Sequence, residues 1–171
     1  GHKGVDLMKE VLEKSLYERN IQYVVLGSGE WEYENFFRYL HDKYPDKVGI
    51  TIGFVPDLAR KIYAGADLFL MPSKSEPCGL SQMVALRYGT LPIVRETGGL
   101  KDSITDCGDG HGNGFTFKTY DAYDMLGAIY RGVDAYNSKD WKVLVKRALE
   151  CDMSWGKSAN EYIKMYRSLL K

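Results

Sequence analysis

The chain has 171 residues, of which 44% are hydrophobic and 27% charged, a composition typical of globular proteins rather than disordered or fibrous ones. Its 23 basic and 23 acidic side chains balance, so no overall field attracts nucleic acid or an anionic membrane. No apolar run reaches the roughly 20 residues that span a bilayer, and the N-terminus lacks a signal-peptide pattern. The length predicts one domain over residues 1–171.

Helices and short apolar strands are predicted to alternate along the chain. Helical spacing of apolar residues covers about residues 4–19, and an apolar strand over 21–26 then ends at Gly-Ser-Gly. The expected elements continue as helix 33–44, strand 48–54, helix 56–66, strand 67–73, helix 79–89, strand 91–96 and a short helix 98–104. A glycine-rich loop over 106–114, an extended piece over 114–119 and helices near 121–136, 139–150 and 154–170 complete the chain.

This alternation indicates βαβ units and an α/β fold, a Rossmann-like doubly wound parallel sheet with helices on both faces. The chain enters a helix directly after Gly-His-Lys-Gly, although a doubly wound domain usually opens on a strand. We therefore expect a domain of a larger protein whose first strand is missing.

Ligands of open parallel sheets bind beyond the carboxyl ends of the strands, beside helix N-termini. Four predicted turns lie there: residues 1–4, 27–29, 53–56, and the pair of turns that holds Glu76 and Thr97. Thr97-Gly98-Gly99 before a helix could cradle a phosphate, although tight-turn glycines without a ligand explain the triplet equally well.

Other residues at these turns also have purely structural interpretations. An acid at Glu76 could simply offset a helix dipole, and Lys3 could be a solvated surface lysine. Phe54 could belong to the core, and Cys78 could be a small buried residue. Cys78, Cys107 and Cys151 contain no CxxC pair, which favours reduced thiols in a cytosolic protein and argues against a zinc site.

The joint occurrence of several motifs is more informative than any one of them. The segment SEPCGLSQMVALRYGTLPIVRETGGLKDSI closely resembles the most characteristic segment of bacterial glycogen synthases and plant starch synthases. HKGVDL, VVLGSGE, ITIGF and AGADLFLMPS precede it in the family's order, and GNGFTF and DMSWGKSANEYIKMY follow. The resemblance covers essentially the whole chain.

The resemblance implies the C-terminal, nucleotide-sugar-binding domain of a two-domain GT-B enzyme. That family transfers glucose from ADP-glucose to the nonreducing end of an α-1,4-glucan, with retention at the anomeric carbon. The glucan would be held largely by an N-terminal domain, and the isolated chain would be inactive. No metal or other cofactor, nucleic acid or membrane is expected, and the compartment would be the bacterial cytoplasm or a plant plastid.

The resemblance also assigns roles to individual residues. Lys3, next to Gly4, would meet the donor phosphates, and Glu76 would lie near the transferred glucose. Glu76 would stabilise an oxocarbenium-like centre rather than act as nucleophile. The remaining residues assigned to nucleotide-sugar binding are Phe54, which would face adenine, Cys78, Gly79, Leu80, and the phosphate turn Thr97, Gly98 and Gly99.

The sequence departs from the family's residue pattern at two positions, and two alternative functions remain. Val84 stands where related retaining glycosyltransferases often carry a second glutamate, and the family's arginine before the Lys-Gly motif falls outside the chain. The alternatives are a related UDP-sugar-dependent retaining glycosyltransferase and a noncatalytic nucleotide-binding module. A dinucleotide-dependent dehydrogenase fits poorly, because no GxGxxG follows a predicted strand.

Overall fold

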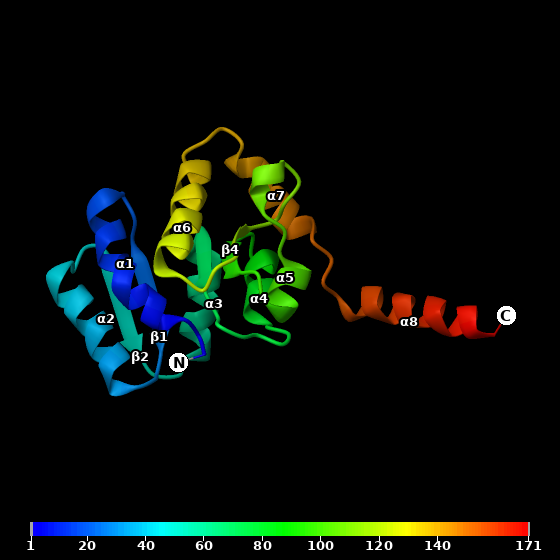
Figure 1. Cartoon of the computed structure of the whole chain (residues 1–171), viewed down its shortest axis with the longest axis horizontal. Helices are drawn as coiled ribbons and strands as arrows, with labels where there is room; N and C mark the ends of the chain where they lie inside the picture. The colour runs from blue at the N-terminus through cyan, green and yellow to red at the C-terminus, as the bar shows by residue number, and fades with distance from the viewer. Residues whose placement is uncertain (1, 171) are drawn as a thin grey trace.

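The computed structural model describes residues 2–170 and confirms the predicted alternation of helices and parallel strands (Figure 1). The first half contains α1 (Val5–Glu18), β1 (Tyr23–Gly27), α2 (Trp31–Lys43), β2 (Val48–Ile52), α3 (Pro56–Gly65), β3 (Leu68–Met71) and α4 (Ser81–Arg87). The second half contains β4 (Leu91–Arg95), α5 (Gly98–Ser103), the 3-10 turn η1 (Cys107–Asp109), β5 (Phe115–Phe117), α6 (Ala122–Tyr136), α7 (Trp141–Glu150) and α8 (Trp155–Leu169).

The strands form two parallel sheets within residues 2–170. β1 pairs with β2, with Tyr23 opposite Val48, and β4 lies between β3 and β5 in a three-stranded sheet. The parallel α/β fold is therefore confirmed, but the sheet is divided between β1 and β3. Both of these strands line one pocket between the two sheets.

One apolar core connects the two sheets through the helices that cover them. α1 and α6 pack against each other, and their buried faces meet the strands of both sheets. Members of this core include Val11 and Leu12 of α1, Leu40 of α2, Ile93 of β4 and Met125 of α6. A smaller cluster beneath α4, α5 and α7 contains Leu86, Val94, Leu100, Ile104 and Ala148. This second cluster supports the end of the sheet at which β4 leads into α5.

Local sequence explains where several helices begin. Pro56 opens α3, where its fixed φ suits the first turn and its missing N–H costs nothing. The Asp121 carboxylate caps α6 by accepting hydrogen bonds from the backbone N–H groups of Tyr123 and Asp124. α8 extends away from the rest of the molecule, and none of its residues is buried (Figure 1). No described helix is long and apolar enough to cross a membrane.

Candidate functional site

An ion pair between Lys3 and Glu76 lies beyond the carboxyl end of β3. The Lys3 ammonium donates a hydrogen bond of 2.6 Å to Oε2 of Glu76, and the Ser73 hydroxyl lies 3.4 Å from the same oxygen. The Glu76 side chain is only 12% exposed, whereas that of Lys3 is 67% exposed. The two residues predicted to be catalytic are thus in contact, with the ammonium accessible to a ligand.

Gly4 fixes the position of the turn that carries Lys3. Its φ of 74° is left-handed, and a Cβ there would lie 2.1 Å from the carbonyl oxygen of Pro72. The backbone N–H of Lys74 also donates a 2.8 Å hydrogen bond to the carbonyl of His2. Only glycine permits this close approach, which holds the turn before α1 against the segment that follows β3.

The turns that contain Glu76 and Thr97 pack directly on each other. This contact agrees with the prediction that both turns lie at the same edge of the sheet. A Cβ at Gly98 would lie 2.3 Å from the Glu76 carbonyl oxygen, and one at Gly99 would lie 2.1 Å from that of Cys78. The Gly99 N–H donates a 3.0 Å hydrogen bond to the Glu76 carbonyl. The glycine pair therefore serves as the surface on which the Glu76 turn rests.

This packing limits what the Thr97 turn can offer an anion. The Thr97 N–H bonds the carbonyl of Arg95, and the Gly99 N–H is occupied as described above. Within residues 2–170, the Gly98 N–H and the Thr97 hydroxyl make no hydrogen bond. The turn thus presents one amide and one hydroxyl to a ligand, fewer donors than a fully open phosphate turn.

The segment after Glu76 is held by a buried glutamine that the sequence did not single out. Gln82 is fully buried, and its amide nitrogen donates to the carbonyls of Cys78 at 3.2 Å and Gly79 at 2.9 Å. Gly79 has a left-handed φ of 73° and packs on the same amide. Cys78 and Leu80 are exposed on the surface of this turn, so Cys78 is not the buried residue that its type suggested.

Arg95, at the end of β4, is a second residue that the sequence analysis missed. Its guanidinium donates to the carbonyl of Ser73 at 3.1 Å and to that of Lys74, and it lies over the ring of Tyr120. The Lys74 ammonium lies 5.4 Å from the centre of that ring. Together with Lys3, these cations give the carboxyl end of β3 a positive rim. The sequence offered one signal for Arg95, because it is a charged residue at the end of an otherwise buried strand.

Tyr120 connects this rim to α1. Its hydroxyl donates a 2.6 Å hydrogen bond to the carboxylate of Asp6. Burial, reinforced by that carboxylate, raises the pKa of Tyr120 to about 12. The phenol therefore keeps its proton well into the alkaline range and remains a hydrogen-bond donor to Asp6.

Phe54 is not in contact with the Lys3–Glu76 pair. It lies in the turn between β2 and α3, in the neighbouring sheet, with 91% of its surface exposed. No ring stacks on it among residues 2–170. This exposure removes the alternative that Phe54 is a core residue. Across the same residues, no three His, Cys, Asp or Glu side chains gather in a way that could hold a metal ion.

The sequence matches proteins of one family along almost its whole length. The family model described as "Glycosyl transferases group 1" matches residues 1–164. A glycogen synthase of Bacillus cereus is 50% identical over 172 aligned residues, which cover 99% of this chain and 36% of that protein. A glycogen synthase of Anoxybacillus flavithermus is also 50% identical, over 98% of this chain and 35% of that protein. The chain thus spans about a third of the length of these relatives, and its resemblance to glycogen synthases is confirmed.

Solved structures agree with this similarity. The catalytic domain of starch synthase IV from Arabidopsis thaliana, bound to ADP and acarbose, matches with a TM-score of 0.85 and 36% identity. The match covers 99% of this chain and 36% of that structure. A sucrose-phosphate synthase from Thermosynechococcus elongatus shares the fold with a TM-score of 0.70 at 21% identity. The chain belongs to the group 1 glycosyl transferases.

Proposed function

We propose that this chain is the donor-binding domain of a glycogen or starch synthase that transfers glucose from ADP-glucose to an α-1,4-glucan with retention. The observation that carries the proposal is the Lys3–Glu76 pair, a nearly buried carboxylate beside an accessible ammonium. Similarity to glycogen synthases at about half identity, and to a starch synthase solved with ADP, supports ADP-glucose as the donor.

The positive rim suits the leaving group of that reaction. When the bond between glucose and the diphosphate breaks, negative charge develops on ADP, and donors already in place stabilise it most effectively. Lys3 is exposed and supplies a mobile ammonium, while Gly98 and Thr97 supply one amide and one hydroxyl. Lys3 would leave Glu76 for a phosphate oxygen when the donor binds.

Glu76 suits the sugar rather than the phosphates. Its carboxylate lies 3.4 Å from the Ser73 hydroxyl and is mostly shielded from water, which would strengthen its interaction with a neighbouring positive centre once Lys3 has moved to the phosphate. It would accept hydrogen bonds from glucose hydroxyls and stabilise the oxocarbenium-like anomeric carbon. The structure of its turn, fixed by Gly98 and Gly99, gives it the rigid placement that such a role requires.

The nucleotide base and the acceptor complete the proposal. Phe54 offers an exposed aromatic face against which adenine would stack, with a contribution of about 1–3 kcal/mol by analogy with base stacking on aromatic residues. The glucan would be held mainly by a separate N-terminal domain of the longer enzyme. The isolated chain would therefore bind ADP weakly and transfer no glucose.

Calorimetric titration of ADP into the chain tests the phosphate role of Lys3. Loss of a hydrogen bond to a charged group costs about 1.5–3 kcal/mol, so Lys3→Ala should weaken ADP binding by about 10–100-fold. Lys142→Ala is the matched control, because Lys142 is an exposed lysine on α7. UDP should bind more weakly than ADP. Equal ADP affinity for the Lys3→Ala and Lys142→Ala variants would contradict the proposal.

Glucose transfer by the longer enzyme tests Glu76. Glu76→Gln keeps the shape of the side chain but removes its charge, so turnover should fall at least ~100-fold while ADP affinity changes little. If the carboxylate instead only offsets a helix dipole, the melting temperature would fall by several degrees and turnover would stay near normal.

A further inference from the structure

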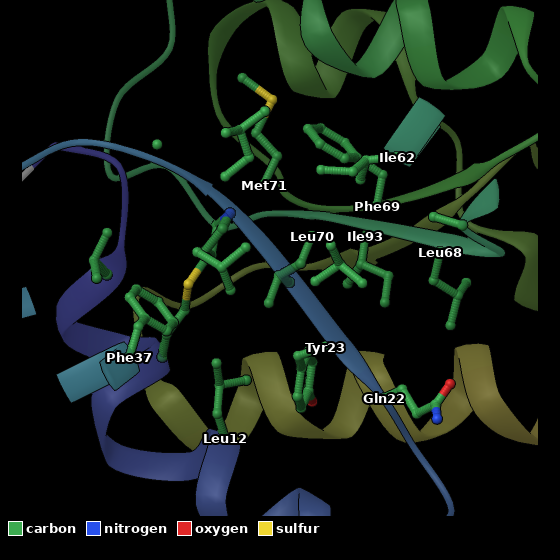
Figure 2. Close-up of a pocket in the computed structure, with 18 of the residues that line it drawn as sticks. Leu12, Gln22, Tyr23, Phe37, Ile62, Leu68, Phe69, Leu70, Met71 and Ile93 are labelled. Carbon is green, nitrogen blue, oxygen red and sulfur yellow. The ribbon is translucent and has the colours of Figure 1, made fainter. Parts of the chain in front are cut away.

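Arg95 ends the central strand of the three-stranded sheet, between the segments that follow its two neighbours. β4 pairs with β3 on one side and with β5 on the other, and all of these strands are parallel. Figure 2 shows Leu70 of β3 beside Ile93 of β4, its partner in the register. Further along β4, the Arg95 side chain reaches both the chain that leaves β3 and the chain that leaves β5.

The guanidinium of Arg95 meets carbonyls on both of these segments. Nε donates to the carbonyl of Ser73 at 3.1 Å, and Nη2 donates to the carbonyl of Lys74. Nη1 lies 3.5 Å from the carbonyl of Lys118, just after β5. A planar guanidinium presents its donors in a fixed fork, so bonds to two consecutive carbonyls set the orientation of the chain as well as its position. Arg95 therefore fixes the backbone that leads to Glu76.

The peptide unit between Ser73 and Lys74 is held from both sides. Its carbonyl accepts the hydrogen bond from Arg95, and its N–H donates a 2.8 Å hydrogen bond to the carbonyl of His2. Hydrogen bonds at the two ends of one peptide unit polarise it and strengthen each other. This peptide thus connects Arg95 with the turn before α1 and with the turn that carries Glu76.

Ser73 extends this constraint to the carboxylate of Glu76. Ser73 is fully buried, and its hydroxyl lies 3.4 Å from Oε2 of Glu76. The backbone route is equally short, because Ser75 alone separates Lys74 from Glu76. A shift of the peptide that Arg95 holds would therefore move both the hydroxyl beside the carboxylate and the backbone of Glu76.

The positive charge of Arg95 has no ion-pair partner among the described residues. Its guanidinium instead contacts carbonyls and the ring of Tyr120, whose centre lies 5.6 Å from Cζ. The hydrogen bond from the Tyr120 hydroxyl to Asp6 holds that ring in place. Because charge-assisted hydrogen bonds are stronger than neutral ones, an arginine that bonds only carbonyls holds this part of the backbone tightly.

We propose that Arg95 is a positioning residue for Glu76 in the transfer reaction, acting through the backbone of Ser73 and Lys74. It has this role only if Glu76 acts on the sugar as proposed above. A carboxylate that stabilises the anomeric carbon must be placed accurately, so loosening its turn slows turnover. Lys3 tolerates more movement, because its ammonium is exposed and leaves Glu76 when the donor binds. Loss of Arg95 therefore affects turnover more than donor binding.

Hydrogen exchange in the chain itself tests the structural step. Arg95→Ala removes the fork that holds the Ser73–Lys74 peptide. The Lys74 amide, which bonds His2, should then exchange at least about tenfold faster than in the unmodified chain. The Leu91 amide at the start of β4 is the internal control and should change much less.

Arg147→Ala is the matched control for this substitution. Arg147 is also partly buried, donates to the carbonyl of Gly112 at 2.8 Å and forms no ion pair within residues 2–170. Gly112 lies in the loop before β5, so Arg147→Ala should leave exchange at Lys74 and turnover unchanged. If Arg95→Ala does not fold, Arg95→Lys replaces it in every measurement, because lysine keeps the charge but lacks the planar fork.

Turnover of the longer enzyme tests the connection to Glu76. Arg95→Ala should lower kcat about 10–100-fold and change KM for ADP-glucose by less than about threefold. In the Glu76→Gln background, the same substitution should lower kcat by less than about threefold, because residues that act through one group are not additive. A residue that only stabilised the fold would give the same factor in both backgrounds.

Faster exchange at Lys74, together with a kcat effect that depends on Glu76, supports the proposal. It is overturned if exchange at Lys74 does not change, if KM rises while kcat stays normal, or if Arg95→Ala lowers kcat equally in both backgrounds. A low kcat for Glu76→Gln beside a normal kcat for Arg95→Ala refutes the role of Arg95 alone. A normal kcat for Glu76→Gln refutes the proposed role of Glu76 and that of Arg95 with it.

Discussion

Replacement of Gly99 by alanine tests whether the glycine pair really supports the Glu76 turn. An added methyl group would lie 2.1 Å from the carbonyl oxygen of Cys78 and 2.6 Å from its carbonyl carbon. These are backbone atoms, so they cannot move aside as the end of a flexible side chain would. Because the Gly99 N–H also bonds the Glu76 carbonyl, the whole turn from Glu76 to Cys78 must shift away from α5.

The magnitude follows from comparing Gly99 with another helical glycine. Gly127 lies in the interior of α6, and an added Cβ would meet no atom within 4 Å. Gly127→Ala should therefore gain the usual helix-propensity difference of about 0.5–1 kcal/mol. Gly99→Ala should instead lose about 1–3 kcal/mol, the usual cost of overpacking. For a chain of this size, these values correspond to a rise in Tm of about 1–4 °C and a fall of about 2–12 °C.

Thermal unfolding of the two variants, followed by ADP titration, measures both consequences. Gly99→Ala should melt below the unmodified chain and bind ADP more weakly, because its clash displaces the turn that carries Glu76. Gly127→Ala should melt slightly above it and bind ADP normally. If Gly99→Ala matched Gly127→Ala in both Tm and affinity, the contact between the two turns would not have the role assigned to it.

Two further predictions concern regions outside the site. The Glu13 carboxylate accepts from Lys43 and from the hydroxyl groups of Tyr39 and Tyr44, and the hydrogen bond from Lys43 is the main cause that lowers its pKa. A carboxyl group whose pKa is lower in the folded state stabilises the fold at pH values above its unfolded-state pKa. This stabilisation is lost as the pH falls through its folded-state pKa. Glu13→Gln should therefore lower Tm by a few degrees or less at pH 7 and leave Tm unchanged near pH 2–3. An equal change in Tm at both pH values would refute the ion-pair explanation. Truncation after Asp152 removes α8, none of whose residues is buried, and should shift Tm by no more than about 2 °C in differential scanning calorimetry. A loss of cooperative unfolding would contradict the exposed position of α8.

Periodicity and turn chemistry were enough to predict most of the elements and the α/β fold. The apolar spacing from Val5 to Leu16 predicted α1, and Pro56 correctly indicated the start of α3. The pairing of strands is not encoded in such local patterns. That β1 and β3 belong to separate sheets and border one pocket became visible only from their pairing.

The candidate site was predicted partly by resemblance and partly by turn position. Lys3 and Glu76 were identified as separate motif residues, and their 2.6 Å contact depends on the packing of Gly4 against Pro72. Gln82 was missed because it acts on backbone carbonyls, which have no residue-specific signature in the sequence. Arg95 could have been noticed as a charged residue that ends a buried strand, but its partners, the carbonyls of Ser73 and Lys74, are known only once the turns have been placed side by side.

The most direct test of the donor-site assignment is a two-dimensional amide NMR titration of the chain with ADP. The account predicts the largest shift changes at Lys3, Gly4 and Gly98, a separate group of changes around Phe54, and little change along α7 and α8. Changes confined to residues away from the carboxyl ends of β2 and β3, or no saturable change at all, would contradict the assignment of this edge as the nucleotide-sugar site.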